Sequence, residues 1–514
     1  MEVFSVDRIQ HSHDGTHADD LVGIATMGVY AAINIRGTID PRGLIPRVGY
    51  PQLRNELPRV RVTLHTDNLA QAQGGDAQAR DWLVAMGKLV GLKENRPTID
   101  LLVTPARNSQ GTAWSSPQAL STYDVEHISS SLQHLYELSL NPNWELMRHP
   151  NEPSAPFVDV KIHQALERHL FVTLDQSILN LALIPRPEGN VFVLTPREAQ
   201  HYIDLCLKAH EKYHIRTNYT ANRSAYYWKR LWNLIPTFQT AWPYTVYGAA
   251  DNLPGGTPIM DFMQALYARL MGQMQACDQI GWLRYSVPTS DARDEMLNQL
   301  NYFIMLATGV FDSLAWLVSH RFGLRVSSQL DITLRAERRP GRGNPLFQQL
   351  DRAAPDLASF FRDHQQQERI GLFYAPRDAI QHRLVLTGAH FNTGQVISDC
   401  NVAFLSREDA QAIQAVDRMI PEQMPFSEWG LITLSDGPEK ILLEPYRFTC
   451  TALRFLFPFV SEVLRLLDFP GWIGARPALK EAADTTIAFA QSRNNVGFDV
   501  SYPQQFEQLP FPWR

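Results

Sequence analysis

The sequence predicts an α+β protein of more than one domain, in which an amino-terminal α/β domain precedes a mainly α-helical domain. The chain of 514 residues is longer than one hydrophobic core usually supports. Short apolar runs alternate with amphipathic segments in the first part, whereas long segments of helical periodicity dominate the second. We therefore expect domains at 1–195 and 196–514, with the helical domain interrupted by a small β insertion at about 391–445.

The first domain is predicted from strand-like and helix-like segments that alternate. Val60–Leu64 and Ile99–Val103 are short, apolar and rich in β-branched residues, as in buried strands, and 191–194 is a third such run. Segments 77–92 and 125–140 have the spacing of amphipathic helices. This alternation is typical of α/β domains.

The second domain is predicted to begin with a helix at Pro196, because Thr195 is a suitable N-cap and proline fits the first helical position. Segment 290–320 has apolar residues alternately three and four apart, and its other faces are also apolar, so neighbouring helices or a partner chain should bury it. Further helices are expected at 346–361 and at 446–467, where Pro458 should cause a kink.

Composition indicates a cytoplasmic protein without a disulfide framework or a zinc ribbon. The four cysteines are far apart and form no CxxC pair: Cys206, Cys277, Cys400 and Cys450. The first residues lack the basic and apolar segments of a signal peptide. The longest apolar stretch, 302–318, is shorter than a membrane span and contains polar residues, so we expect no membrane association.

The charge distribution restricts any contact with nucleic acid to one region. The whole chain has a net charge of −6, which is not that of a protein that coats nucleic acid through a basic surface. Segment 321–383 nevertheless holds eleven arginines and seven acids. A local contact with phosphates is therefore expected there.

The segment Arg377–His382 carries the most specific chemical signal. Arginine can bind and neutralise a phosphodiester, and histidine can transfer a proton near neutral pH. Pro376 is predicted to occupy the first helical position, with Asp378 in the first turn. Residues five apart on a helix diverge by about 140°, so one copy of this motif does not direct both side chains at one atom. Either the arginine curls over the helix start, or a second copy of the motif contributes.

Arg377, the polar Asp378 and His382 resemble the motif of the HEPN family, in which an arginine, four to six residues and a histidine lie on a helix of an all-α bundle. The resemblance implies a metal-independent ribonuclease whose paired motifs meet in a homodimer, with Arg377, Asp378 and His382 as catalytic residues. It implies RNA as the partner and a role in anti-phage defence or a toxin–antitoxin system. The amino-terminal domain would then sense a signal or bind a regulatory protein. The alternative is a non-catalytic, HEPN-like scaffold that dimerises and binds a nucleotide or a protein.

Arginines next to the motif are candidates for RNA binding. Arg335, Arg338, Arg339 and Arg342 lie in a segment whose glycines, Gly341 and Gly343, allow it to adapt, and Arg383 follows the motif directly. A solvated surface linker is the alternative interpretation of this charged segment. Asp312, in the middle of an apolar helix, either points into the site or bonds to a neighbouring polar group.

No metal or cofactor is expected. The histidines of segment 11–17, with Asp14, superficially resemble a metal site, but a second cluster of ligands is missing and a polar turn is the ordinary interpretation. The sequence also lacks the phosphate-binding loop of common nucleoside triphosphatases, the glycine fingerprint of dinucleotide-binding folds and the nucleophile elbow of serine hydrolases.

Overall fold

The computed structural model describes five short segments before residue 196 and most of the chain from 196 to 494. The early segments are 60–64, 99–103, 143–147, 170–172 and 192–194. The gaps in the later part are 217–218, 286–289, 340–341, 383–385, 392–399, 406, 418–427, 434–440 and 475. All structural statements below refer to the described residues.

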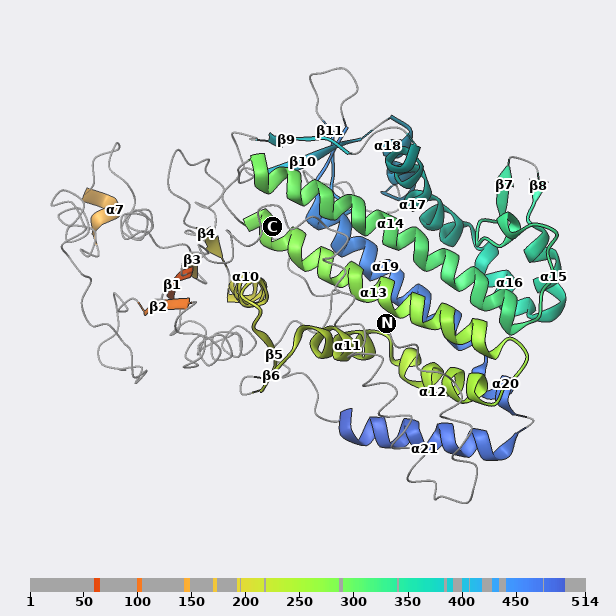
Figure 1. The fold of residues 1–514 in the computed structure, drawn as a ribbon. Coiled ribbons are helices and arrows are strands. Elements are labelled where there is room, and N and C mark those ends of the chain that lie inside the picture. Colours follow the sequence, from red (N-terminus) through yellow and green to blue (C-terminus); the bar gives the residue numbers. More distant parts are fainter. Residues whose placement is uncertain are drawn as a thin grey trace.

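The described part of the chain is mostly helical (Figure 1). One short helix, α7, spans Trp144–Met147. The other helices are α10 (Pro196–Ala209), α11 (Arg223–Leu234), α12 (Pro236–Ala250), α13 (Gly256–Tyr285), α14 (Ser290–Arg321), α15 (Pro345–Ala353), α16 (Pro355–Arg362), α17 (His364–His382), α18 (Arg407–Asp417), α19 (Pro445–Leu466), α20 (Phe469–Ile473) and α21 (Pro477–Asn494).

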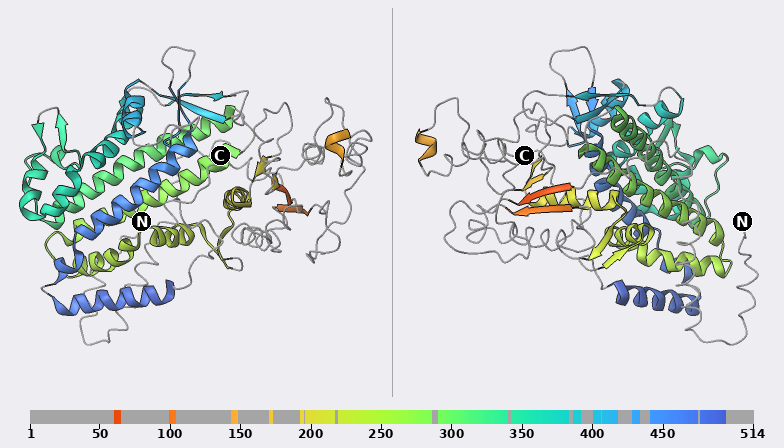
Figure 2. Two further views of the ribbon diagram at one scale, coloured as in Figure 1. Left: turned by 180° about the vertical axis from the view of Figure 1, so that it is seen from behind. Right: turned by 60° about the vertical axis from the view of Figure 1, so that its left-hand side comes forward.

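The two longest helices, α13 and α14, lie side by side and are packed against α19, which runs behind the pair in Figure 1 and in front of it in the reverse view of Figure 2. The predicted apolar seam of α14 is confirmed: Leu297, Leu300, Ile304, Ala307, Phe311, Leu314 and Val318 are all buried. The side chains from residue 299 to residue 322 are all buried or half-buried. The helix is therefore enclosed by its neighbours along most of its length.

Among the described helices, α14 has the length and hydropathy of a candidate membrane span. Its most apolar window of 18 residues has a mean hydropathy of 1.5, and 67% of that window is buried inside the protein. Burial of this kind is typical of a core helix.

Several helices begin where the sequence supplies a cap and a proline. Pro345 and Pro445 occupy first helical positions. Before them, the side chain of Asn344 accepts a hydrogen bond from the Leu346 amide at 2.9 Å, and Glu444 caps α19 in the same way. The helix predicted at 346–361 is instead two helices, because Pro355 begins a new one after Ala354. Helix α19 continues through Pro458, which is exposed.

Two four-stranded sheets are present in the described residues. The first is parallel, in the order β2-β1-β3-β4, and contains β1 (Val60–Leu64), β2 (Ile99–Val103), β3 (Leu170–Val172) and β4 (Phe192–Leu194). The second is antiparallel, in the order β11-β12-β10-β9, and contains β9 (Gly388–Phe391), β10 (Cys400–Leu405), β11 (Leu431–Thr433) and β12 (Ile441–Leu443). Two hairpins complete the strands: β5 (Tyr213–Arg216) with β6 (Tyr219–Ala221), and β7 (Glu337–Arg339) with β8 (Arg342–Gly343).

The strands predicted at 60–64 and 99–103 are therefore confirmed, and the run at 191–194 contains β4. The helices predicted at 77–92 and 125–140 lie outside the described residues. The strands expected in the β insertion are found from residue 388 to 443, with α18 between β10 and β11.

The predicted start of the motif helix is wrong. Helix α17 begins at His364, so Pro376 lies in its interior and Asp378 is not in its first turn. The buried side chains of Ile370, Leu372 and Phe373 anchor the helix before the proline. Their packing outweighs the backbone hydrogen bond that proline cannot donate. Asp378 is therefore not placed to interact with the positive end of the helix dipole.

Replacement of Gly388 by alanine should destabilise the protein by about 1–3 kcal/mol. A Cβ atom at this position would collide with the backbone carbonyl of Val402 on β10. Urea unfolding should show the loss. Gly371→Ala in α17 is the matched control, because open space surrounds its Cβ position, and it should stabilise by about 0.5–1 kcal/mol. Equal effects at the two glycines would contradict the predicted clash.

Candidate functional site

Arg377 lies on α17 in a half-buried position beside Tyr374, which is one turn earlier in the same helix. Tyr374 is only 8% exposed, and its hydroxyl donates a hydrogen bond to Oδ1 of Asp312 at 3.1 Å. Asp312 belongs to α14, so this bond joins the motif helix to the buried central helix. Asp312 thus makes the polar contact that the sequence left as one of two possibilities.

Arg335 approaches the same tyrosine from a loop that precedes β7. Its guanidinium carbon is 5.2 Å from the centre of the Tyr374 ring, a distance at which a cation is attracted to the aromatic face. Two backbone contacts fix this loop. The Arg335 amide donates to Oγ1 of Thr333 at 3.3 Å, and its carbonyl accepts from Nδ2 of Asn344 at 2.8 Å.

A third arginine, Arg269, reaches this region from α13. Its guanidinium donates a hydrogen bond to the hydroxyl of Ser313, the residue after Asp312. We refer to Arg269, Asp312, Arg335, Tyr374 and Arg377 as the arginine cluster. It draws side chains from α13, α14, α17 and the loop before β7.

For Asp312 and Arg269, burial and the neighbouring charges shift the pKa in opposite directions. Burial raises the pKa of Asp312, while the hydrogen bond from Tyr374 and the charges of Arg377 and Arg269 act to lower it. Burial also lowers the pKa of Arg269, against the effect of Asp312. The pKa of Tyr374 is raised by burial and by the nearby Asp312 carboxylate. The charges of Arg269 and Arg377 thus act on one carboxylate, and Arg335 lies over the ring of the tyrosine that donates to it.

This arrangement can bind an anion, because planar guanidinium groups donate paired hydrogen bonds to phosphate or carboxylate oxygens. It does not suggest a metal site. Within the described residues, no group of three or more histidine, cysteine, aspartate or glutamate side chains could hold a metal ion. The histidines of segment 11–17 lie outside the described residues.

The other predicted site residues are described only in part. Asp378 and His382 belong to α17, but their side chains lie outside the described residues. The same holds for the side chains of Arg338 and Arg339 on β7 and of Arg342 on β8, and Arg383 lies outside the described residues altogether. Arg269 was missed by the sequence analysis, because nothing in its local pattern distinguishes it from any other helix arginine.

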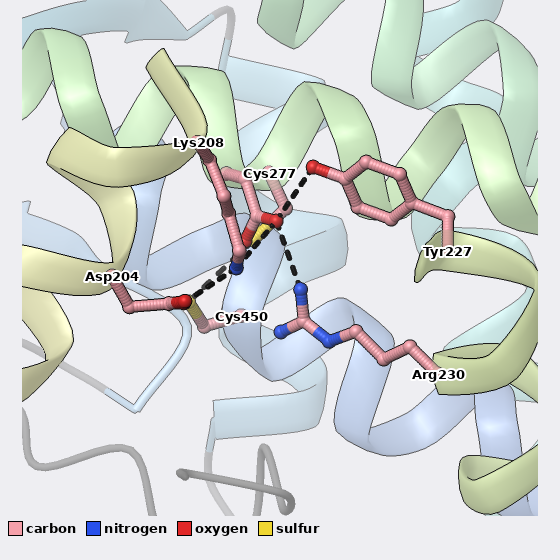
Figure 3. A network of polar contacts seen from close by, with 7 residues as sticks. Asp204, Lys208, Tyr227, Arg230, Cys277 and Cys450 are labelled. Carbon is pink, nitrogen blue, oxygen red and sulfur yellow. Dashed lines mark hydrogen bonds and ion pairs between the residues drawn. The ribbon is translucent and has the colours of Figure 1, made fainter. Parts of the chain in front are cut away.

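A second polar cluster lies deep between α10, α11 and α13 (Figure 3). Oδ2 of Asp278 accepts hydrogen bonds from Lys208 at 2.9 Å, from Arg230 at 2.8 Å and from the Tyr227 hydroxyl at 2.8 Å. Lys208 also pairs with Asp204 at 2.6 Å. All five side chains are buried. We call this set the buried ion network.

The buried ion network contains as many acidic as basic side chains. Burial alone would raise the pKa of Asp278, but Arg230 and Lys208 outweigh it and hold the pKa at about 2. Nearby, Sγ of Cys277 lies 3.7 Å from Sγ of Cys450 in the core. Burial raises the pKa of the Cys450 thiol, and a thiol of that kind is a poor nucleophile. This region therefore holds helices together.

No protein-family model matches this chain, and no curated protein or solved structure is significantly similar to it. Any functional assignment therefore depends on the chemistry of the residues described above.

Asp278→Asn should destabilise the fold by about 3–5 kcal/mol, because it leaves Lys208 and Arg230 buried without their shared carboxylate. Urea unfolding at pH 7 measures the loss. Asp351→Asn is the matched control. It removes a carboxylate from an exposed pair with Arg362 and should leave the stability close to that of the wild type. A loss in Asp278→Asn no larger than that of the control would contradict a structural role for the network.

Lowering the pH should destabilise the protein by protonating Asp278 of the same network. The pKa of Asp278 is about 2 in the folded protein, below its ordinary value of 3.8. Its contribution to stability is thus complete above pH 3.8 and is lost as the pH falls toward 2. In that range, the stability of the wild type should fall more steeply with pH than that of Asp278→Asn. Parallel curves would show that Asp278 does not titrate as expected.

Proposed function

We propose that this protein is a metal-independent endoribonuclease of the HEPN type. The observation that carries the proposal is the position of Arg377 one turn after Tyr374, where its charge acts on Asp312, on the helix that also contains His382. An arginine in such surroundings is suited to bind a phosphodiester next to a residue that can transfer a proton.

In the proposed reaction, a ribose 2′-hydroxyl attacks the adjacent phosphorus atom. A bond forms between O2′ and phosphorus, and the bond between phosphorus and O5′ of the next nucleotide breaks. His382 acts as general base or general acid in the two proton transfers, and Arg377 stabilises charge on the phosphorane-like transition state. Asp378 orients one of these two side chains. The products are a 2′,3′-cyclic phosphate and a 5′-hydroxyl.

We propose that the active form is a homodimer in which the motif helices of two subunits meet. The divergence of about 140° between positions five apart on a helix still favours a site made from two motifs. The proposed RNA-binding surface also includes Arg338, Arg339, Arg342 and Arg383.

Such a nuclease would act in the cytoplasm, in anti-phage defence or as a toxin. The amino-terminal α/β domain would respond to a signal or bind a regulatory protein.

A second candidate function is a non-catalytic, HEPN-like scaffold that binds a nucleotide or a protein. The observation that favours it is that Tyr374 donates to Asp312 of the same chain and that the charges of Arg377 and Arg269 act on this carboxylate. An arginine whose charge acts on an internal carboxylate can serve the stability of the bundle. A cleavage assay separates the two candidates.

His382→Ala should reduce RNA cleavage by about 10²- to 10⁴-fold, because it removes the proton-transfer group. Cleavage of single-stranded RNA in the presence of excess EDTA is the measurement, and the wild type should retain its activity in the chelator. The control is His364→Ala, since His364 is exposed at the opposite end of α17. Full activity of His382→Ala would contradict the assignment of His382, and activity restored only by a divalent ion would contradict a metal-independent reaction.

The composite site predicts complementation between two inactive variants. Arg377→Ala and His382→Ala should each be inactive alone, but their mixed dimers contain one site with both an intact arginine and an intact histidine from different subunits. Refolding or subunit exchange of the mixture should therefore restore part of the wild-type activity. Sedimentation equilibrium should show a dimer in each variant. A monomeric enzyme whose cleavage rate is proportional to protein concentration, with no recovery on mixing, would rule out the shared site.

A further inference from the structure

Two cysteines meet in the core where α13 packs against α19 (Figure 3). Sγ of Cys277 lies 3.7 Å from Sγ of Cys450, so the two sulfur atoms are in contact, and each side chain is only 1% exposed. The two residues are 173 positions apart in the chain and belong to different helices. The fold, and not the local sequence, therefore brings these thiols together.

The contact between α13 and α19 is close and well defined beside these thiols. One turn after Cys277, a Cβ atom at Gly281 would lie 2.6 Å from Cε2 of Tyr446. Further along the same contact, Nε of Arg284 lies 3.3 Å from Oε1 of Glu444, and both side chains are buried. A glycine that lets the helices approach and a buried ion pair thus fix the register in which the two sulfur atoms face each other.

The two sulfur atoms are near enough to bond. In a disulfide they are about 2.0 Å apart, so Sγ of Cys277 and Sγ of Cys450, at 3.7 Å, have to approach by about 1.7 Å. Each sulfur atom can turn about its Cα–Cβ bond, and rotation of the two side chains can close a gap of this size.

We propose that Cys277 and Cys450 form a redox modification site, at which a peroxide converts the two thiols into a disulfide that joins α13 to α19. The inference goes beyond the proposed function and does not depend on it.

The reaction with the peroxide has two steps. One thiol loses its proton and attacks a peroxide oxygen, so that a sulfur–oxygen bond forms, the oxygen–oxygen bond breaks and the departing hydroxide takes up the proton as water. The second sulfur atom then loses its proton and attacks the sulfenic acid, so that the disulfide forms and a second water leaves. Two thiols are oxidised, and one hydrogen peroxide molecule is reduced to two water molecules.

Burial makes this cross-link slow to form and slow to break. It raises the pKa of the Cys450 thiol, although the charge of Arg454 and a hydrogen bond with Tyr446 act to lower it, so the first step has few thiolates to start from. Once a sulfenic acid has formed, the other sulfur atom is already in contact with it. A thiol reductant from solution, in contrast, has to reach the core before it can attack the disulfide.

The test is prolonged treatment of the purified protein with hydrogen peroxide, followed by peptide mapping without reduction. A pair of cross-linked peptides that contain Cys277 and Cys450 is expected. The urea midpoint of the oxidised protein should be higher than that of the reduced protein, because the cross-link closes a long loop in the unfolded chain. Dithiothreitol should reduce the disulfide much more slowly in the folded protein than in urea.

Two variants show whether the pair is responsible. Cys277→Ala should form no cross-link at Cys450, and its urea midpoint should not rise on oxidation. Cys206→Ala is the matched control, because Cys206 is also fully buried but its sulfur lies 3.7 Å from Nδ1 of His210. This control should form the cross-link and gain stability as the wild type does. Each variant is compared before and after oxidation, so the cavity left by the substitution does not affect the comparison.

Three results would overturn the inference. The first is a cross-link that joins Cys277 or Cys450 to Cys206, to Cys400 or to a second copy of the chain. The second is a disulfide between the expected partners that leaves the urea midpoint unchanged or lowers it. The third is the absence of any cross-linked peptide in protein whose methionines have been converted to the sulfoxide, since that conversion shows that the peroxide was active.

Discussion

The burial of most of the central part of α14 is the constraint on which the rest of the structure depends. The side chains from 299 to 322 are buried or half-buried, so a partner inside the protein stabilises a polar group on this part of the helix. Thr308 donates to backbone carbonyls of its own helix, and Ser313 accepts from Arg269. Asp312 accepts from Tyr374 and is close to two arginines. The contacts of the arginine cluster thus follow from the position of a half-buried carboxylate on a largely buried part of the helix.

The two polar clusters differ in burial. In the buried ion network, two acids face two bases, Asp204 and Asp278 against Lys208 and Arg230, and all four are almost fully buried. Such a set is satisfied without any ligand and stabilises the contact of α10, α11 and α13. In the arginine cluster, the three arginines and Asp312 are only half-buried, and Tyr374 alone is buried. That difference separates a structural network from a candidate binding site.

The sequence was sufficient to predict elements whose signals are local. The heptad-like spacing of α14 and the β-branched runs at 60–64 and 99–103 depend on a few adjacent residues, and each was found. Pro376 was misassigned because proline suits a helix start as well as an interior position stabilised by tertiary packing. Arg269 could not be identified from the sequence, since its role depends on Gly309, forty residues away in another helix.

Pro376 divides helix α17 into two parts, and the turn between them bends more easily than the rest of the helix. Tyr374 lies before it and Arg377 after it, and the missing proline N–H leaves this turn with one backbone hydrogen bond fewer than its neighbours. Bending is therefore cheaper here than elsewhere along α17. A ligand that draws Arg377 away from Asp312 can change the angle between the two parts while Tyr374 remains packed. Occupancy of the site would then be transmitted to the end of the helix, at His382, as a small change of direction.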